Sequence, residues 1–450
     1  MRSESIILAA GLGTRMNSSV PKLLQPLAGR PMIRWSAIAC QEATGTEPYL
    51  IVPPDGTVIG EAAGGSSKWI EQTEPIGTGH AVLQAADRLG GESDLILVVN
   101  ADMPLLSADT LRSLVEAQSE SSGVVTLLTS ISEQSRGFGR IVRDEADAVA
   151  GIVEEAEASA EQLALTELNV GAYCFDSKWL WKELANVPIS LKGEYYLTDA
   201  IELASKGAEG ITAIQVGDPD ETIGVNTMEH LAQAEAAARR NINRQWMQSG
   251  VRMIDPNTTY IDVEVRVGSG TVILPNTHLG GSTVIGEDCR VGPNSIIRNA
   301  EIADGCAIEA SVVDKAVLEA GVDVGPFARL RPGAKLGPGV HVGNFGEIKD
   351  STLAAGVKVG HFSYLGDATI GENVNIGAGT ITCNYDGKRK NATTINEGAF
   401  IGSDTMLVAP VTIGVGARTG AGAVVTKDVP DHTLAAGVPA RVIRKLDPDD

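Results

Sequence analysis

The sequence predicts an α/β domain of Rossmann-like type with a mostly parallel sheet, followed by a linker helix and a hexapeptide-repeat parallel β-helix. Three observations predict this order. Strand-like and helix-like segments alternate over residues 1–226. An apolar stripe of helical period covers residues 227–250. Apolar residues then recur every six positions over residues 251–450, which end in a short tail.

In the first part, continuous apolar runs such as SIILAAG, DLILVVNADMPLL and GVVTLLTS indicate buried strands, and helical patterns such as GHAVLQAADRL lie between them. This alternation favours a mostly parallel sheet covered by helices. In the second part, apolar residues recur three or four positions apart along one helix face, and Gly250 provides a stop signal. That face consists of Met228, Leu231, Ala234, Ala238, Ile242 and Trp246.

In the third part, seven consecutive aliphatic residues stand six apart, from Ile261 to Ile297. After a shift in phase, seven more run from Val312 to Ile348. This period is typical of a parallel β-helix, in which each short strand directs one aliphatic side chain inward. The largest interruption, TCNYDGKRKNATT at 382–394, is polar and basic, so we expect a loop that projects from the binding face. A three-sided prism also favours a homotrimer.

Charge and composition restrict the partners. The formal net charge is −21, a surface that repels nucleic acid and anionic membranes, so we expect neither as a partner. No stretch approaches the roughly 20 consecutive apolar residues of a membrane span, and we expect a soluble, cytoplasmic protein. The five cysteines form no C-x-x-C pair, which argues against a zinc site, and their odd number argues against a disulfide framework.

The segment LAAGLGTRMNSSVPKLL, residues 8–24, contains a glycine turn after a strand. A dinucleotide fingerprint needs a third small residue after Gly11 and Gly13, but Met16 stands there, and no P-loop Gly-Lys-Ser/Thr follows. What remains is a turn that exposes backbone N–H groups, followed by Arg15 and Lys22, which suits a nucleoside triphosphate. The alternative is an ordinary strand–turn–helix corner with surface charges.

Further motifs follow in order: GTGHA (77–81), NADMPLL (100–106), GFGRIV (137–142), GIVEE (151–155), LNVGAY (168–173), GEYYLTD (193–199) and GVNT (224–227). With the glycine turn, they resemble the signature of sugar-phosphate nucleotidyltransferases. With the β-helix and the stretch GHFSYLGDATIGENVNIGAGTITCNYDGKRK (360–390), nearly the whole chain resembles the bacterial family of bifunctional N-acetylglucosamine-1-phosphate uridyltransferases and glucosamine-1-phosphate acetyltransferases. The resemblance implies that the β-helix is left-handed.

The first catalytic site is expected around Asp102, which lies just past an apolar strand, at the edge where open α/β sheets bind ligands. Its carboxylate suits Mg²⁺, although a lone Asp is more often a strand-end cap. The resemblance implies Asn226 as the second metal ligand and catalysis through positioning and charge neutralisation. It also implies which residues contact UTP and the product UDP-N-acetylglucosamine: Leu8, Ala9, Ala10, Gly11, Arg15, Lys22, Gln72, Gly77, Thr78, Gly139, Glu154, Asn169, Tyr196, Thr198 and Asn226.

This first site departs from the family pattern at two positions. Ala101 stands where the family has glycine, and Pro75 stands where a polar residue is expected near the base. Both bear on nucleotide selectivity rather than on the type of reaction. Glu155 and Glu157, which follow Glu154, are interpreted as solvated surface.

The second catalytic site is expected around His361, because the resemblance implies that this residue is the catalytic base. An amine that attacks a thioester must lose a proton, and histidine is the usual base near pH 7. The alternative is a corner histidine bonded to the backbone. We expect Glu347 to orient His361 or tune its pKa. Arg331 and Lys349 stand 18 residues apart, one coil, so they stack on one face.

The resemblance completes this second site. It implies that Lys390, Tyr364 and Asn375 join Arg331 and Lys349 in binding glucosamine-1-phosphate. It also implies that acetyl-CoA is bound by Ala378, Asn384, Tyr385, Ser403, Ala421 and Arg441.

Taken together, the resemblance implies an enzyme that makes UDP-N-acetylglucosamine for cell-wall precursors from acetyl-CoA, UTP and amino-sugar phosphates. Three alternatives stay open. One is a monofunctional sugar-phosphate nucleotidyltransferase whose β-helix is structural, and the second is a non-catalytic nucleotide-sugar sensor. The third is an acyltransferase with a degenerate first domain.

Overall fold

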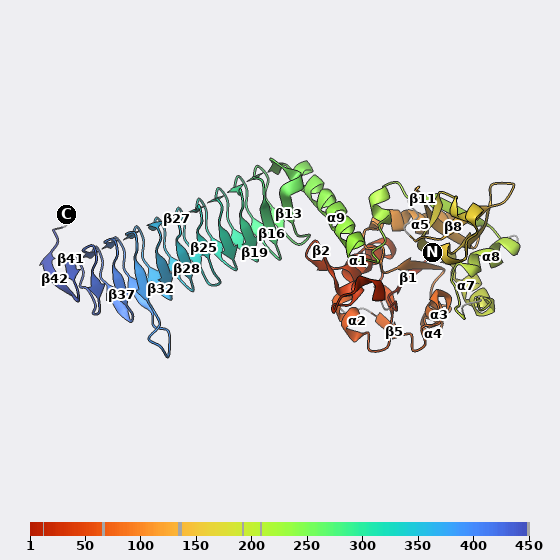
Figure 1. Ribbon diagram of the computed structural model, residues 1–450, viewed down its shortest axis with the longest axis horizontal. Coiled ribbons are helices and arrows are strands. Elements are labelled where there is room, and N and C mark those ends of the chain that lie inside the picture. Colours follow the sequence, from red (N-terminus) through yellow and green to blue (C-terminus); the bar gives the residue numbers. More distant parts are fainter. Residues whose placement is uncertain (12, 65–67, 134–136, 191–192, 208, 448–450) are drawn as a thin grey trace. The chain divides into compact units, whose positions relative to one another are not determined.

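The computed structural model describes residues 1–11, 13–64, 68–133, 137–190, 193–207 and 209–447. The chain divides into two compact units, Met1–Ala238 and Arg239–Asp450 (Figure 1). The helix α9 (Met228–Gln248) lies within the range expected for the linker and contributes residues to both units. Within the described residues, no helix is both long and apolar enough to span a bilayer.

The first unit is built on a nine-stranded sheet whose central path is β11-β7-β10-β6-β1-β4-β5. Strand β10 runs antiparallel to both β6 and β7, whereas the other pairs along this path are parallel. Along this path the prediction of a mostly parallel sheet is confirmed, but β8 pairs antiparallel with both β9 and β10, so the sheet as a whole is mixed. The strands are β1 (Ser3–Leu8), β4 (Tyr49–Val52), β5 (Lys68–Glu71), β6 (Leu95–Asn100), β7 (Val125–Ile131), β8 (Arg140–Arg143), β9 (Val149–Val153), β10 (Glu167–Asp176) and β11 (Ile211–Gln215).

Helices cover both faces of this sheet, because successive residues of a strand point to opposite sides. Ile7 of β1 belongs to the core cluster that includes residues of α1, α2 and α5, whereas Ile6 belongs to the cluster that includes residues of α3, α7 and α8. A short hairpin, β2 (Pro26–Leu27) with β3 (Arg30–Pro31), precedes α1. The helices are α1 (Met32–Thr44), α2 (Thr57–Ala63), α3 (Thr78–Leu83), α4 (Ala86–Leu89), α5 (Ala108–Glu120), α6 (Ala160–Leu163), α7 (Ser177–Glu183) and α8 (Asp199–Lys206).

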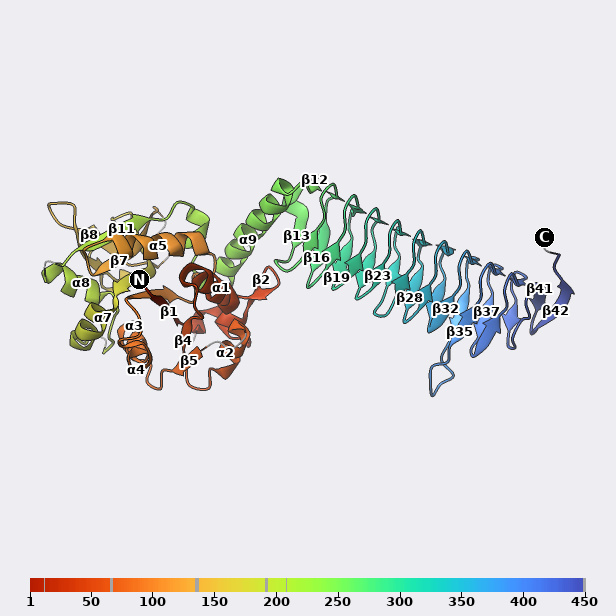
Figure 2. The same cartoon turned by 180° about the vertical axis from the view of Figure 1, so that it is seen from behind.

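The second unit is a stack of coils, each of which adds one short strand to each of three sheets (Figures 1 and 2). We call these sheets the first, second and third face. The first face consists of β12 (Arg252–Met253), β15 (Val272–Ile273), β18 (Arg290–Val291), β21 (Ala307–Ile308), β24 (Asp323–Val324), β27 (His341–Asn344), β30 (Lys358–His361), β33 (Asn375–Ile376), β36 (Phe400–Ile401), β39 (Arg418–Thr419), β41 (Thr433–Gly437) and β42 (Ala440–Lys445).

The other two faces follow the same pattern. The second face consists of β13 (Thr259–Ile261), β16 (Thr277–Gly280), β19 (Ile296–Arg298), β22 (Val312–Asp314), β25 (Arg329–Leu330), β28 (Glu347–Lys349), β31 (Tyr364–Gly366), β34 (Ile381–Cys383), β37 (Met406–Val408) and β40 (Val424–Val425). The third consists of β14 (Arg266–Val267), β17 (Val284–Ile285), β20 (Glu301–Ile302), β23 (Val317–Leu318), β26 (Lys335–Leu336), β29 (Thr352–Leu353), β32 (Ala368–Ile370), β35 (Thr393–Ile395) and β38 (Val411–Ile413).

Neighbouring coils pair in parallel, which confirms the predicted parallel β-helix. The exception is β42, which folds back antiparallel on β41 and ends the first face. The prediction is wrong by one position at the start of the second aliphatic series. Val312 is 37 % exposed, and the neighbouring Val313 is the buried side chain. The coils are shorter here, since Ile297 pairs with Val313 only 16 residues further along the chain, and the six-residue count therefore slips.

Candidate active sites

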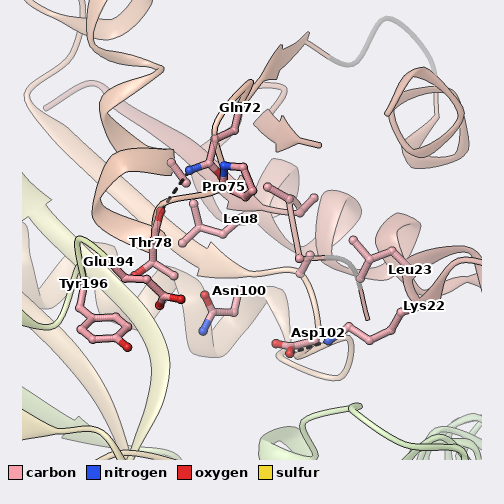
Figure 3. A pocket seen from close by; sticks show the side chains of 16 residues that line it. Leu8, Lys22, Leu23, Gln72, Pro75, Thr78, Asn100, Asp102, Glu194 and Tyr196 are labelled. Atoms are coloured by element: carbon pink, nitrogen blue, oxygen red, sulfur yellow. Dashed lines mark hydrogen bonds and ion pairs between the residues drawn. The ribbon is translucent and has the colours of Figure 1, made fainter. Parts of the chain in front are cut away.

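The first unit contains two adjoining cavities at the carboxyl ends of β1 and β6. The first has a volume of about 340 Å³ and the second about 360 Å³. They share the lining residues Leu8, Thr78, Asn100, Asp102 and Tyr196, so together they form one bipartite site. Figure 3 shows the side chains that line the first cavity.

Every residue predicted for the first site lines one of these cavities. The residues that line only the first cavity are Ala9, Ala10, Gly11, Lys22, Gln72 and Gly77. Those that line only the second are Arg15, Gly139, Glu154, Asn169, Thr198 and Asn226. Leu8, Thr78, Asp102 and Tyr196 line both. The fold therefore brings together residues that the sequence spreads over more than 200 positions.

Lys22 is central to the charge arrangement of the site. Its Nζ lies 2.9 Å from Asp102 Oδ2 and 3.1 Å from Asn226 Oδ1 (Figure 3 marks the first of these contacts). Arg15 Nη2 donates to the same Asn226 oxygen at 2.9 Å. The backbone N–H of Val225 donates to Asp102 O at 2.8 Å, which holds the two chain segments together. The two residues predicted as metal ligands thus share one cation, the Lys22 ammonium.

The glycine turn packs directly against Lys22. Gly13 has φ +61°, and a Cβ at this position would lie 2.6 Å from Lys22 Cβ. The following residues form two short 3₁₀ turns, Thr14–Met16 and Lys22–Leu24. Glycine is therefore required at position 13 both by its φ angle and by the close approach of Lys22.

In the first cavity, the predicted ligand-contacting residues Gln72 and Thr78 lie on either side of Gly77 and are held by the neighbouring backbone. The side chain of Gln72 is 2 % exposed, and its Nε2 donates to Gly77 O at 3.2 Å. Gly77 has φ +113°, and a Cβ there would overlap the backbone of Tyr195. Thr78 Oγ1 accepts from the Leu197 N–H at 2.9 Å, which joins the start of α3 to the segment that carries Tyr196.

The two positions that depart from the family pattern both lie at the site. Pro75 lines the first cavity (Figure 3). Ala101 also lines this cavity, and its backbone N–H donates to Leu8 O at 3.1 Å.

In the second cavity, polar side chains are paired with one another. Thr198 Oγ1 donates to Glu154 Oε1 at 3.0 Å. The Tyr173 hydroxyl donates to Asn169 Oδ1 at 3.0 Å, and the backbone N–H of Asn169 donates to Gly139 O at 2.9 Å. Burial raises the pKa of Tyr173, so its phenol stays neutral and remains a donor. The arrangement offers several oriented hydrogen-bonding groups to a polyhydroxylated ligand.

Two further residues, one that lines this site and one that follows its lining residue Gly139 in the chain, were not singled out from the sequence. Asn100 lines both cavities, and a Cβ on Gly171 would overlap its amide nitrogen. The side chain of Arg140 is 3 % exposed, donates to Phe138 O and lies 3.4 Å from Glu155 Oε2. Glu155 is therefore an ion-pair partner rather than simply a solvated acid. Both residues lie within the motifs NADMPLL and GFGRIV, and that position was their only signal.

In the second unit, His361 lies exposed at the end of β30 on the first face. The register places Asn344 of β27 opposite His361, and His361 Nδ1 is 3.1 Å from Asn344 Oδ1. An amide oxygen only accepts, so Nδ1 carries the proton and Nε2 is left free to accept one. The side chain that orients His361 is thus Asn344 and not Glu347, which accepts from Arg331 Nη1 at 2.8 Å.

Three of the six residues predicted to bind acetyl-CoA, Ala378, Ser403 and Ala421, lie in line with this histidine. Asn375 pairs with Lys358 in the coil before it and with Phe400 in the coil after it. Three residues further along each strand, the chain reaches the corner between the first and second faces. Register therefore places the corner residues of successive coils in one row, which we call the corner row: Asn344, His361, Ala378, Ser403 and Ala421.

Arg441 is placed near the end of the corner row. It lies on β42, where it pairs with Ala436, one coil beyond Gly420. It also lines a small hollow of about 210 Å³ together with Lys427 and Asp428.

The three cations predicted to bind glucosamine-1-phosphate lie near one another at the end of the second-face strands. Leu330 pairs with Ile348, so Arg331 and Lys349 lie in adjacent coils, as their spacing predicts. Lys349 Nζ is 2.7 Å from Asp350 Oδ2, a contact that raises the pKa of Lys349. The neighbouring Lys349 ammonium lowers the pKa of Lys390. Two ammonium groups that repel each other would both be stabilised by a bound phosphate.

Tyr364, Asn384 and Tyr385 complete this region. Asn384 Nδ2 donates to Asp367 Oδ2 at 2.5 Å and lies 3.5 Å from the Tyr364 hydroxyl. Tyr385 is 64 % exposed at the base of the loop between β34 and β35, which projects from the stack in both views (Figures 1 and 2). The loop predicted from the break in the repeat is therefore present.

Comparisons with known proteins cover both units. The MobA-like NTP transferase domain matches residues 5–172, and the bacterial transferase hexapeptide (six repeats) matches residues 264–299. A bifunctional protein GlmU from Exiguobacterium sibiricum is 46 % identical over 97 % of this chain and 97 % of the relative. GlmU proteins from Heliobacterium modesticaldum and Enterococcus faecalis are both 44 % identical over 96 % of this chain, and over 95 % and 94 % of their own lengths.

The chain belongs to the GlmU family of bifunctional proteins. Because these GlmU relatives align over nearly the whole chain, the likeness extends to both compact units. This disfavours the alternatives in which only one unit is functional. It also agrees with the resemblance that the motifs of the sequence indicate.

Proposed function

We propose that this chain catalyses two successive reactions and so forms UDP-N-acetylglucosamine for cell-wall precursors. The second unit acetylates glucosamine-1-phosphate with acetyl-CoA. The first unit transfers UMP from UTP to N-acetylglucosamine-1-phosphate and releases pyrophosphate. The observation that carries the proposal is GlmU membership along nearly the full chain, and the assembly of the residues predicted for the first site in two adjoining cavities supports it. We further propose that the enzyme works in the cytoplasm as a homotrimer.

In the acetyl transfer, His361 acts as the general base. Its Nε2 takes the proton from the sugar amine as the nitrogen attacks the thioester carbonyl, while Asn344 holds Nδ1. A C–N bond forms, the C–S bond breaks and the coenzyme A thiolate leaves. Arg331, Lys349 and Lys390 hold the sugar phosphate, and the small side chains of the corner row leave room for the carrier.

In the uridyl transfer, the donor set fits a magnesium ion. Asp102 Oδ2 and Asn226 Oδ1 both converge on one cationic nitrogen, and Mg²⁺ prefers hard oxygen ligands of this kind. When bound, Mg²⁺ neutralises charge on the phosphates. Arg15 and Lys22 place positive charge beside the glycine turn, where the leaving pyrophosphate is held.

The second cavity orients the acceptor sugar through Glu154, Thr198 and Asn169. The acceptor's phosphate oxygen is thereby directed at the α-phosphorus. The new P–O bond forms in line with the bond to pyrophosphate as that bond breaks.

The test uses the full chain and both reactions. Thiol release from acetyl-CoA is measured with glucosamine-1-phosphate, and pyrophosphate release is measured with UTP and N-acetylglucosamine-1-phosphate. We expect His361→Ala to lower the first rate by about 10²- to 10⁴-fold, the usual contribution of a general base, and to leave the second unchanged. Asp102→Ala should do the reverse, so each variant is the matched control for the other.

Two results would contradict the proposal. Folded wild type that releases no thiol would leave the β-helix as a scaffold and favour a monofunctional nucleotidyltransferase. Thiol release without pyrophosphate release would favour an acyltransferase with a degenerate first domain.

A further inference from the structure

Lys22 bridges the two oxygen donors that the proposed function assigns to a divalent cation. Its Nζ lies 2.9 Å from Asp102 Oδ2 and 3.1 Å from Asn226 Oδ1, and its side chain is only 10 % exposed. Among the contacts of the described residues, no other side chain joins these two oxygens. Arg15 reaches Asn226 Oδ1 at 2.9 Å from a more exposed position. A cation therefore already stands between the donors.

The base of Lys22 is fixed, whereas its tip can move. Lys22 begins a 3₁₀ turn whose next residue, Leu23, is 4 % exposed, and the Gly13 turn packs against its Cβ. Four rotatable bonds separate that Cβ region from the ammonium, so the tip can leave the donors without any change in the backbone. The natural destination is the neighbouring turn, where a triphosphate would offer its oxygens.

A divalent ion and the ammonium cannot both bind these oxygens. An ion held by Asp102 Oδ2 and Asn226 Oδ1 would stand where Nζ stands, and like charges at such a distance repel strongly in a partly buried site. We propose that Lys22 is a resident monovalent cation that competes with the divalent ion. In the substrate-free protein it keeps the metal affinity low, and it leaves the donors only when phosphate oxygens accept it.

This inference rests on the proposed function, because it takes Asp102 and Asn226 as the metal ligands. It adds an order to that function. Metal and nucleotide bind together rather than independently, since the nucleotide provides the acceptors that release Lys22. The coupling is reciprocal, so bound metal should also favour nucleotide.

The experiment titrates Mn²⁺ into the substrate-free full chain and follows the free ion by electron paramagnetic resonance. Lys22→Met keeps an unbranched side chain, one atom shorter, and removes its charge. We expect it to bind one Mn²⁺ at least about tenfold more tightly than wild type. Lys22→Gln serves as a second neutral variant. Arg15→Met is the matched control, because it removes a cation that bonds Asn226 alone, and it should change the affinity by less than about threefold.

Three results would overturn the inference: neutral Lys22 variants that bind Mn²⁺ no more tightly than wild type, an equal gain in Arg15→Met, or a gain that persists in the double variant Lys22→Met/Asp102→Ala. The last result would mean that the ion binds elsewhere. The titration needs no turnover, so it is separate from the test of the proposed function. Absence of uridyl transfer would refute that function and leave this titration unchanged.

Discussion

Replacing Asn344 with alanine removes the hydrogen bond to His361 Nδ1, which measures 3.1 Å in the structure. This bond selects one tautomer, with the proton on Nδ1 and the lone pair on Nε2, and it fixes the plane of the ring. Without it, the imidazole divides its population between two tautomers and more than one orientation. The proposed base is then in the productive form for only part of the time.

The size of the effect follows from the exposure of the site. A net hydrogen bond contributes about 0.5–1.5 kcal/mol. Because His361 is exposed, water competes for Nδ1, and the lower part of this range applies. About 0.5–1 kcal/mol corresponds to a loss of about 2- to 5-fold in the acetyl-transfer rate, since about 1.4 kcal/mol is a factor of ten. This is far smaller than the loss of about 10²-fold or more expected for His361→Ala.

The assay is thiol release from acetyl-CoA with saturating glucosamine-1-phosphate. Asn344→Asp keeps an oxygen acceptor opposite His361 Nδ1, and it should therefore retain more activity than Asn344→Ala. Uridyl transfer in the same preparations reports on folding of the first unit. An unchanged rate in Asn344→Ala would refute the orienting role, and a loss as large as that of His361→Ala would place Asn344 in the chemistry itself.

Burial, with nearby Glu202, Glu157 and Glu154, raises the pKa of Asp199 to about 6, above its ordinary value of 3.8. Its contribution to stability is therefore present at low pH and lost as pH rises towards 6, so Asp199→Asn should raise Tm at pH 8 but not at pH 4; an equal gain at both would contradict this. In Gly366→Ala the new Cβ would overlap the Tyr364 hydroxyl and lie 2.7 Å from Asn384 Nδ2. Acetyl transfer should fall by about tenfold or more while uridyl transfer is unchanged, and undiminished thiol release would refute the placement. Arg140→Met leaves Glu155 and the Phe138 carbonyl without their partner. It should raise KM for N-acetylglucosamine-1-phosphate more than it lowers kcat, whereas Arg140→Lys should recover part of that loss; a change in kcat alone would argue against a positioning role.

The architecture was predictable because both of its patterns are local. A strand buried on both faces is a continuous apolar run, as in Leu95–Asn100, whatever its neighbours are. A β-helix buries one aliphatic side chain per short strand, so aliphatic residues recur in the sequence with the period of the strands. Where the coils shorten, the period alone fails, and Val312 was assigned inward in place of Val313. The antiparallel course of β10 was also absent from the prediction, since apolar content does not encode strand direction.

The sequence by itself indicated which residues to expect at the two candidate sites, because each motif is a contiguous stretch that contains several of them. Only the tertiary structure decided their partners. Lys22 meets Asp102 and Asn226 across 80 and 204 residues, and Asn344 meets His361 through the register of two coils. Ala378 and Ser403 lie in adjacent coils only because the extra residues between β34 and β35 project from the stack as a loop and leave the register of the strands unchanged. Such pairings depend on how separate segments pack, and local pattern holds no information about that packing.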